Sequence, residues 1–459
     1  MKLDRRWFLG HAAAATGAVA APSAARAADS SFSKRLTAAL DEVRLYDSHE
    51  HLIAEAERTR QAVDFFTLAG HYALNDVISA GLSGDARATV ADQRAPLERR
   101  WAAFEPGWKA ARFTGYGQAL SIAIRDIYGE AEISGASIGR INEAIRKANQ
   151  PGLYRRVLRE RARIDWCLVD PYWAEKPARL DQDYFLLAQK FDGFVTPRTR
   201  KDIDRLETIS GVSIHSLADH KKALEKTFDQ AMAAGMVAVK STLAYARDLL
   251  FSEVPEPDAA RDFEALLKGG VELPQGFRAQ QQRPFRKLED HMFHCVVRLA
   301  EAHRKPFQIH TGLLAGNGCF VGNTNPTHLT NLFFLYPSVK FDLFHIGYPY
   351  QEELGVLAKV FPNVYADFCW AHIISPPGSR RALDEYLETV PVNKILAFGG
   401  DYRFPELTYA HAKIARRNLA QVLAAKVEAG LFGEDQALEI GRLLLRDNAL
   451  ALFPPSRAS

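Results

Sequence analysis

The sequence predicts an α/β fold, a (β/α)8 or TIM barrel, from two observations. First, apolar segments of about four to six residues, rich in β-branched and aromatic side chains, recur along the chain. Buried parallel strands have this continuous hydrophobicity, because helices cover both faces of the sheet. Second, helix-like patterns lie between these segments, for example over residues 220–234, 289–303 and 351–360. Regular alternation of strand and helix predicts a parallel sheet, and eight repeats predict a closed barrel.

The predicted strands follow one another along the chain, separated by loops and helices. They cover residues 43–46, 164–169, 191–195, 236–239, 306–309, 339–344, 363–366 and 394–398. The tail over residues 409–453 has the pattern of two amphipathic helices. We expect these two helices to close the barrel.

Two connections are longer than a simple barrel needs. Residues 52–160 separate the first two strands and are predicted to be a large helical insertion, with strong segments at 97–112 and 138–163. Residues 245–288, between the fourth and fifth strands, are predicted to be a second, loop-rich insertion because they contain Pro255, Pro257, Pro274 and Pro284. Long insertions in compact domains often form lids or specificity loops.

The first residues of the chain are typical of an export signal. Arg5-Arg6 precede Trp7-Phe8-Leu9, a mild Ala-rich stretch follows, and Ala25-Arg26-Ala27 offers small residues at a cleavage site. The pair of arginines indicates the twin-arginine export machinery. We expect cleavage after Ala27 and a periplasmic or secreted product, with residues 28–459 as one domain. An amphipathic N-terminal helix or an uncleaved anchor are the alternatives.

Charge and cysteine content exclude several classes of function. The chain has 58 Lys and Arg against 55 Asp and Glu, a net charge of +3, which gives no electrostatic reason to expect nucleic-acid binding. The signal segment carries all of this excess, so the mature chain is formally neutral. The cysteines are Cys167, Cys295, Cys319 and Cys369, and no CxxC pair occurs. Zinc-finger and thioredoxin functions are therefore excluded, and we expect buried free thiols.

Polar residues stand where the predicted strands end. Barrel enzymes build their sites at the C-terminal ends of the strands. Residues two apart in a strand face the same way, so both histidines after the first strand should point into the barrel mouth. The residues at the ends of strands one, four, five, six and eight are His49, His51, Lys240, His310, His345 and Asp401.

Each of these residues has an ordinary structural interpretation. A buried histidine is commonly hydrogen-bonded core, a lysine such as Lys240 is commonly salt-bridged, and Asp401 after two glycines is commonly part of a turn. Their joint placement favours a metal site. Nitrogen and oxygen ligands without thiolate suit Zn²⁺, the first choice, or Mn²⁺ or Fe²⁺. Metal-bound water reaches a pKa near 7, and Asp401 is predicted to act as general base or proton shuttle.

This pattern resembles the amidohydrolase superfamily, in the strand order HxH, Lys, His, His, Asp. Within it the chain is most similar to the amidohydrolase-related group, which includes the amidohydrolase domain of glutamine-synthetase fusion proteins. The segments that carry the resemblance are VAVKSTLAYARDLLF, KILAFGGDYRF and the stretch from FQIHTG through FHIGYPY to NVYADF.

The resemblance implies a ligand set for one or two divalent ions. His49, His51, His310 and Asp401 would surround one metal. Lys240 and His345 would join a second metal or position the substrate, and Lys240 would be carboxylated if it bridges two ions. The Tyr402-Arg403 pair in GGDYRF is similar to uronate isomerases, which share the barrel.

Three functions remain open from the sequence. The first is a metal-dependent hydrolase of an amide, lactone or related carbonyl in a small molecule, with His345 stabilising the oxyanion. The second is a metal-dependent isomerase or lyase acting on a sugar acid. The third is a non-catalytic periplasmic binding protein. Residues expected to bind the substrate are Arg112, Tyr116, Arg247, Asn325 and Arg403. The sequence leaves the oligomeric state open, a homo-oligomer included.

Overall fold

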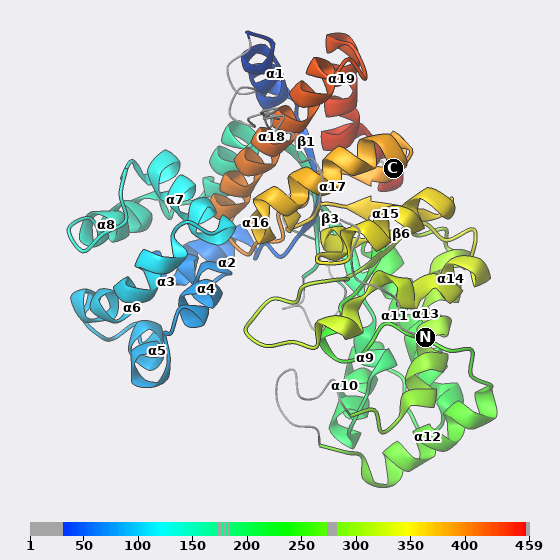
Figure 1. The fold of residues 1–459 in the computed structure, drawn as a ribbon. Helices are drawn as coiled ribbons and strands as arrows, with labels where there is room; N and C mark the ends of the chain where they lie inside the picture. Colours follow the sequence, from blue (N-terminus) through cyan, green and yellow to red (C-terminus); the bar gives the residue numbers. More distant parts are fainter. Residues whose placement is uncertain (1–30, 172–176, 178–179, 181–182, 273–281, 456–459) are drawn as a thin grey trace, which may run out of the picture.

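The computed structural model describes residues 31–171, 177, 180, 183–272 and 282–455, and these residues form the predicted barrel. Eight strands make one parallel sheet in which each strand pairs with the next along the chain. Helices surround the sheet (Figure 1). The strands are β1 (Leu45–Glu50), β2 (Ile164–Val169), β3 (Phe185–Lys190), β4 (Met236–Ser241), β5 (Phe307–Ile309), β6 (Phe341–Leu343), β7 (Val364–Asp367) and β8 (Ile395–Leu396).

The prediction for the third strand was wrong. Residues 191–195 leave the sheet, and Asp192–Val195 form the short helix α9. The strand is the preceding apolar run, β3, which pairs with β2 and β4. Both runs are apolar, but the Asp-Gly pair in 191–195 favours a turn or a helix start rather than a strand. Strand three therefore ends at Lys190.

The barrel closes between β1 and the segment that follows β8. The Ser48 amide donates to the Phe398 carbonyl at 3.1 Å, and the Asp401 amide donates to the His49 carbonyl at 2.9 Å. Glycine is required here, because a Cβ on Gly400 would lie 1.8 Å from Glu50 Oε1. Closure of the barrel therefore also brings Asp401 beside His49.

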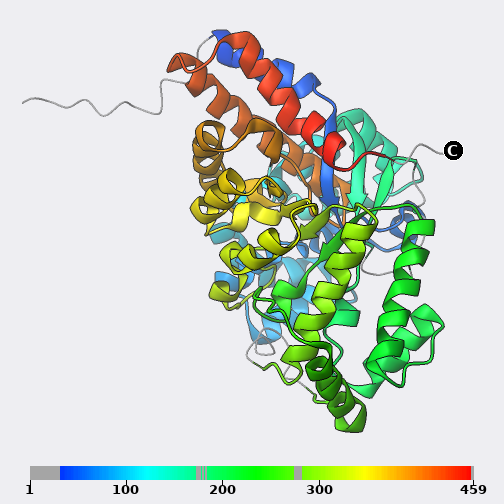
Figure 2. The same ribbon diagram turned by 90° about the vertical axis from the view of Figure 1, so that its right-hand side faces the viewer.

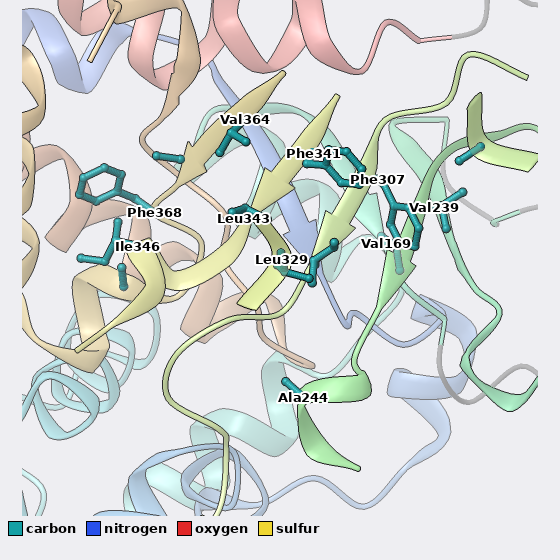
Figure 3. Close-up of a cluster of buried hydrophobic side chains, with 14 of the residues drawn as sticks. Val169, Val239, Ala244, Phe307, Leu329, Phe341, Leu343, Ile346, Val364 and Phe368 are labelled. Atoms are coloured by element: carbon teal, nitrogen blue, oxygen red, sulfur yellow. The ribbon is translucent and has the colours of Figure 1, made fainter. Parts of the chain in front are cut away.

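Apolar side chains between the strands and the outer helices form the main core. Figure 3 shows part of it, with Phe307 and Phe341 on neighbouring strands. These two rings are stacked with their centroids 6.3 Å apart, and both are almost fully buried. Burial of each such ring stabilises the fold by about 1.5–3 kcal/mol. The core thus holds the strand ends at fixed positions.

The outer layer contains the predicted helices with small changes of boundary. The helix predicted at residues 351–360 is confirmed with the same bounds, as α15. The helices between β3 and β8 are α9, α10 (Arg200–Ser210), α11 (Leu217–Ala233), α12 (Glu256–Gly269), α13 (Arg286–Ala302), α14 (Thr330–Leu335), α15 (Gln351–Val360), α16 (Ala371–Ile374) and α17 (Pro376–Thr389). Short 3-10 segments among them are η3 (Leu243–Tyr245), η5 (Val321–Thr324), η6 (Pro326–Leu329), η7 (Phe344–Gly347) and η8 (Val392–Lys394).

The insertion after β1 is helical, as predicted, and lies beside the barrel (Figure 1). Its apolar side chains pack in one cluster with residues that follow the barrel strands, for example Phe344, Trp370 and Phe404. The predicted helix at 138–163 is split, because Pro151-Gly152 interrupts it. Its helices are α2 (Glu55–Arg60), α3 (Phe65–Ala69), α4 (Ala73–Ser79), α5 (Gly84–Ala91), α6 (Leu97–Ala111), α7 (Gly115–Tyr128), α8 (Ile138–Ala148) and the π-helical η2 (Arg155–Arg161).

The second insertion is less loop-like than the prolines suggested. Pro257 lies in the first turn of α12, where a proline fits because the first backbone N–H groups of a helix have no partner within it, and α12 packs against α13. Pro274 lies outside the described residues. The predicted loop-rich insertion therefore includes a 14-residue helix.

The C-terminal helices pack against the first helix of the described chain. They are α18 (Pro405–Glu428), α19 (Glu434–Arg442), η9 (Leu443–Asp447) and α20 (Asn448–Leu452). In Figures 1 and 2, α1 (Ser31–Glu42) lies beside α18 and α19. Residues 1–27, the predicted export signal, lie outside the described residues. No helix among the residues described here is both long enough and apolar enough to cross a membrane.

Candidate metal centre

Three predicted ligands meet where β1 approaches the segment after β8. The His49 and His51 rings lie edge to face with centroids 4.9 Å apart, and His51 Nε2 is 3.2 Å from Asp401 Oδ1. One ligand atom from each of the three residues lies within 4.8 Å of the others. His49 Nε2 is buried and has no hydrogen-bond partner among the described residues. An unpaired buried nitrogen beside a second imidazole and a carboxylate fits a divalent metal ion.

Gln308, on β5, fixes which nitrogen of His49 carries the hydrogen. Its amide nitrogen donates to the Ser48 carbonyl at 2.9 Å and to Asp342 Oδ2 at 3.1 Å. The remaining amide atom, Oε1, can only accept, and it lies 3.3 Å from His49 Nδ1. His49 Nδ1 therefore carries the hydrogen, and Nε2 keeps a lone pair for a metal.

His310 and His345 form a second pair of imidazoles at the same end of the barrel. The outer nitrogen of each ring donates to a backbone carbonyl: His345 Nδ1 to Cys369 at 2.7 Å, and His310 Nε2 to Leu313 at 2.9 Å. The inner nitrogens then face each other at 3.1 Å. Burial lowers the pKa of both, that of His345 to about 4, so both rings are neutral.

The two facing nitrogens are consequently lone pairs that repel each other. A cation that contacts both of them removes this repulsion, and zinc–nitrogen bonds of about 2.0–2.1 Å can span such a gap. Asp401 lies within reach as well, with Oδ2 4.0 Å from His345 Nε2. His345, Cys369 and Asp401 also form a group compact enough to hold a metal ion. The donor set therefore fits one or two divalent ions.

Backbone strain is concentrated around these residues. His345, Trp370, Asp401 and Tyr72 all have positive φ angles, from 60° to 79°, which non-glycine residues rarely adopt. Each such residue costs on the order of 1–3 kcal/mol, and strain of this kind is typical of functional sites. Burial raises the pKa of Asp401, but the hydrogen bond and the electrostatic interaction with the His51 ring outweigh it and hold the pKa well below its usual value. Asp401 is therefore a carboxylate.

Lys240 is buried at the end of β4. Its Nζ lies 3.3 Å from the centroid of the Phe344 ring, and burial lowers its pKa to about 8. The charges of Asp401 and Asp170 are close enough to raise that pKa in part. The structure thus brings Lys240 to the same end of the barrel as the histidines.

Two of the five predicted substrate-binding residues lie near this centre. Tyr116 is buried and stacks on Trp370 and Tyr72, with ring centroids 6.0 and 5.3 Å away. Arg403 lies two residues after Asp401 and lines a cavity of about 320 Å³ together with His71. Trp370 lies edge to face with His345, with ring centroids 5.1 Å apart, so this aromatic stack borders the metal ligands, whereas the lining of the Arg403 cavity includes none of them.

The structure does not bring the other three predicted residues to the centre. Arg247 is fully buried in ion pairs with Glu289 and Asp290, at 2.9 and 2.6 Å, so its guanidinium is used in the fold. Asn325 caps η6 by accepting from the Thr327 amide. Arg112 is exposed and lines a different cavity between α7 and α18.

Sequence reasoning left His71 unassigned, since it follows no strand. Its ring stacks on Tyr72, and the charges of His51 and Asp401 act on it. Burial lowers its pKa to about 3, so the ring is neutral. The Arg403 amide donates to His71 Nδ1 at 3.2 Å, which leaves the hydrogen on Nε2 as a donor. No periodic signal in the insertion could have indicated this residue.

Two further groups near the centre come from strands β2 and β3. Asp170 follows β2, and its carbonyl oxygen is 3.3 Å from His51 Nδ1. Lys190, at the end of β3, forms an ion pair with Asp170 at 3.0 Å. The strand-end rule would have found Lys190 if the third strand had been placed correctly.

Comparison with known sequences supports the same family. The sequence model of the amidohydrolase family matches residues 225–454, which is half of the chain and includes His310, His345 and Asp401. The chain therefore belongs to the amidohydrolase family.

Two curated relatives and one solved structure are similar to the chain over different shares of its length. Protein fluG of Emericella nidulans is 29% identical over 285 residues, 60% of this chain but only 32% of that protein. A uronate isomerase of Nostoc punctiforme is 23% identical over 433 residues, 87% of this chain and 89% of the relative. The crystal structure of a uronate isomerase from Thermotoga maritima has 16% identity and a TM-score of 0.73, covering 92% of this chain and 97% of the other. The last similarity shows the barrel fold, insertion included.

Proposed function

We propose that this protein is a metal-dependent isomerase of a sugar acid. This choice reverses the order expected from the sequence, where hydrolysis came first. The observation that carries it is the position of Arg403. Its backbone amide donates to His71, it follows the carboxylate Asp401 by two residues, and its charge acts on His71, on which His51 and Asp401 act as well. A guanidinium close to a metal centre and a base suits a substrate with both a carboxylate and a carbonyl. The near full-length similarity to a uronate isomerase supports the same choice.

The residues of this chain can perform the proton transfers that isomerisation needs. An aldehyde sugar acid becomes a keto acid when C2 loses a proton, the C1 oxygen gains one, C1 gains a proton and the C2 oxygen loses one. No water is consumed. A divalent metal held by His49, His51 and Asp401 would polarise the carbonyl group. Asp401, as a carboxylate, would accept a proton, and His71 would donate the hydrogen on Nε2 to a substrate oxygen.

The test compares substrates that differ only in the carboxylate. Mature metal-loaded protein is incubated with a hexuronate and with the matching neutral aldose, and products are identified by NMR. We expect isomerisation of the uronate alone. Arg403→Met should lower kcat/KM for the uronate roughly tenfold or more, because one charge-assisted contact is lost. Equal activity on both sugars, in wild type and variant, would remove the proposed role of Arg403.

Hydrolysis is the second candidate, and the amidohydrolase family match favours it. The same carboxylate could take a proton from an attacking water, and His345 could stabilise an oxyanion.

The number of metal ions per chain and the carboxylation of Lys240 also stay predictions. Elemental analysis would measure the number of ions, and the intact mass of the native protein would show an added CO2 on the lysine.

A further inference from the structure

A second cavity lies outside the metal centre, between the insertion and the barrel. It has a volume of about 420 Å³ and is bordered by α1, α7 and α18. Gln118, Ser121 and Arg125 of α7 line it, whereas Tyr116 of the same helix stacks on Trp370 beside the centre. None of the proposed metal ligands lines this cavity. It is therefore a separate site.

The cavity contains more positive than negative charge. Its lining includes Arg112, Arg125, Lys413 and Arg417 against a single acid, Asp41. The adjacent Asp126 pairs with Arg125 at 2.7 Å and with Lys413 at 2.8 Å. That carboxylate neutralises part of the excess.

Arg112 and Arg417 have no carboxylate within ion-pair distance in the part of the chain that the structure describes. Arg112 packs over the exposed Phe113 ring, 4.8 Å from its centroid. Arg417 is held by a neutral acceptor, Gln118 Oε1, at 3.3 Å. Partial burial and the nearby charge of Arg380 lower the pKa of Arg417. The two guanidinium groups thus line the cavity without a carboxylate among the described residues to neutralise them.

We propose that this cavity binds a small organic oxyanion, with carboxylate or phosphate oxygens held by Arg112 and Arg417. Guanidinium groups bind such oxygens in bidentate geometry. The volume falls within the range of small-molecule sites, which is about 300–1,000 Å³. An anion bound by both would join the end of α6, directly before α7, to α18, and so would restrain α7, whose opposite face carries Tyr116. This inference is independent of the reaction at the metal centre.

The experiment measures binding of inorganic phosphate and of citrate to the mature metal-loaded protein by calorimetry. Comparing phosphate with citrate shows whether the cavity prefers a tetrahedral oxyanion or a carboxylate. The test variant is Arg112→Gln/Arg417→Gln. The control, Arg94→Gln/Arg146→Gln, removes the same charge from two exposed arginines elsewhere in the insertion. We expect saturable binding that weakens roughly tenfold or more in the test variant and stays unchanged in the control.

Two results would overturn the proposal. One is the absence of saturable binding of either anion by the wild-type protein. The other is equal weakening in both double variants, which would indicate only general charge attraction. If the glutamine variant does not fold, Arg112→Lys/Arg417→Lys keeps the charge and removes the bidentate fork. Weaker binding by this variant supports the site, and unchanged binding of both anions contradicts it. The rate at the metal centre should not change in a variant that folds, because neither arginine lies there.

Discussion

Single hydrogen bonds decide the chemical state of the side chains at the metal centre. Gln308 places the hydrogen of His49 on Nδ1, and the Arg403 amide places that of His71 on Nε2. Backbone carbonyls fix the outer nitrogens of His310 and His345 in the same way. The remaining lone pairs of His310 and His345 face each other, and the lone pair of His49 Nε2 has no hydrogen-bond partner among the described residues. The arrangement is therefore prepared for a cation before any cation binds.

Replacing Gln308 should weaken metal binding although Gln308 is not a ligand. In Gln308→Leu, His49 Nδ1 loses its acceptor and the ring can turn or change tautomer. We expect a loss of about 10- to 100-fold in metal affinity, as is usual for residues that orient ligands. Competition with a chelator measures it. Unchanged affinity in a correctly folded variant would refute the role given to Gln308.

Removal of the metal should lower the melting temperature of the wild-type protein. Without a cation, the facing nitrogens of His310 and His345 repel each other, and the buried Nε2 of His49 lacks a partner. Ligand binding to the folded state stabilises it, by about 2.7 kcal/mol at 100 times Kd. Calorimetry with and without a chelator tests this, and added Zn²⁺ should restore the loss. In His49→Ala/Asp401→Ala the chelator should have a smaller effect.

At the level of elements, close packing of the segment after β8 against β1 and of α7 against α18 determines where the site residues lie. The first contact needs Gly400, and the second uses the ion pair of Asp126 with Lys413. Neither contact is conspicuous in the sequence. Both connect segments that are far apart along the chain.

Gly400→Ala should disturb barrel closure. The new methyl group would meet Glu50 Oε1, and overpacking of this kind costs about 1–3 kcal/mol. Gly139→Ala in α8 is the control, because nothing lies within 4 Å of its Cβ position. Alanine there should stabilise the helix by about 0.5–1 kcal/mol. Denaturant unfolding of both variants gives the comparison, and a neutral Gly400→Ala would contradict the closure argument.

Asp126 should contribute stability that depends on pH. Burial raises its pKa, but hydrogen bonds and charges from Arg125 and Lys413 outweigh this and lower it to about 2. A carboxylate with a lowered folded-state pKa stabilises the protein above the unfolded-state value of about 3.9, and this contribution disappears as pH falls toward 2. The pair is partly exposed, so we expect less than about 1 kcal/mol.

Urea unfolding of wild type and Asp126→Asn measures this contribution. The difference between the two proteins should be present at neutral pH and shrink as the pH falls below about 4. Asp229→Asn, at an exposed position of α11, provides the control and should show no such trend. A difference for Asp126→Asn that stays constant with pH would contradict the proposed ion pairs.

The elements that the sequence predicted best are those with a strong periodic signal. From the strand ends, the sequence predicted that His49, Lys240, His310 and Asp401 lie at the same end of the barrel. This prediction was possible because the alternation of side chains and the direction of a strand are local properties. Arg247 could not be judged locally, because its partners Glu289 and Asp290 lie 42 and 43 residues away along the chain. Asn325 instead caps η6 through Thr327, two residues on, and the Asn325-Pro326 pair is a local turn signal. His71 was missed since its position depends on the packing of the insertion over the barrel mouth.

At the scale of the whole molecule, one barrel supplies the metal centre and one insertion covers it. The insertion contributes His71 and Tyr72 on the side of the centre, and Arg112 on the side of the second cavity. The candidate site is therefore divided between a barrel of the amidohydrolase family and a helical layer beside it. The export signal would direct this unit out of the cytoplasm, and we propose a periplasmic location.

Replacing the paired arginines should block export. In Arg5→Lys/Arg6→Lys the feature that defines the twin-arginine signal is lost while the charge is kept. We expect the full-length precursor to remain in the cytoplasm, whereas the wild-type protein appears in the periplasm without its first 27 residues. Cell fractionation with mass spectrometry measures both. Normal export of the variant would contradict this route.

Isomerisation of a sugar acid at the metal centre is tested most directly by comparing two substrates. One preparation of metal-loaded mature protein is given a hexuronate and, separately, a sugar lactone, and NMR follows both. The claim predicts conversion of the aldehyde acid to its keto isomer, no opening of the lactone above the uncatalysed rate, and loss of conversion in Asp401→Asn. Catalysed opening of the lactone with no change in any uronate would contradict it and identify a hydrolase.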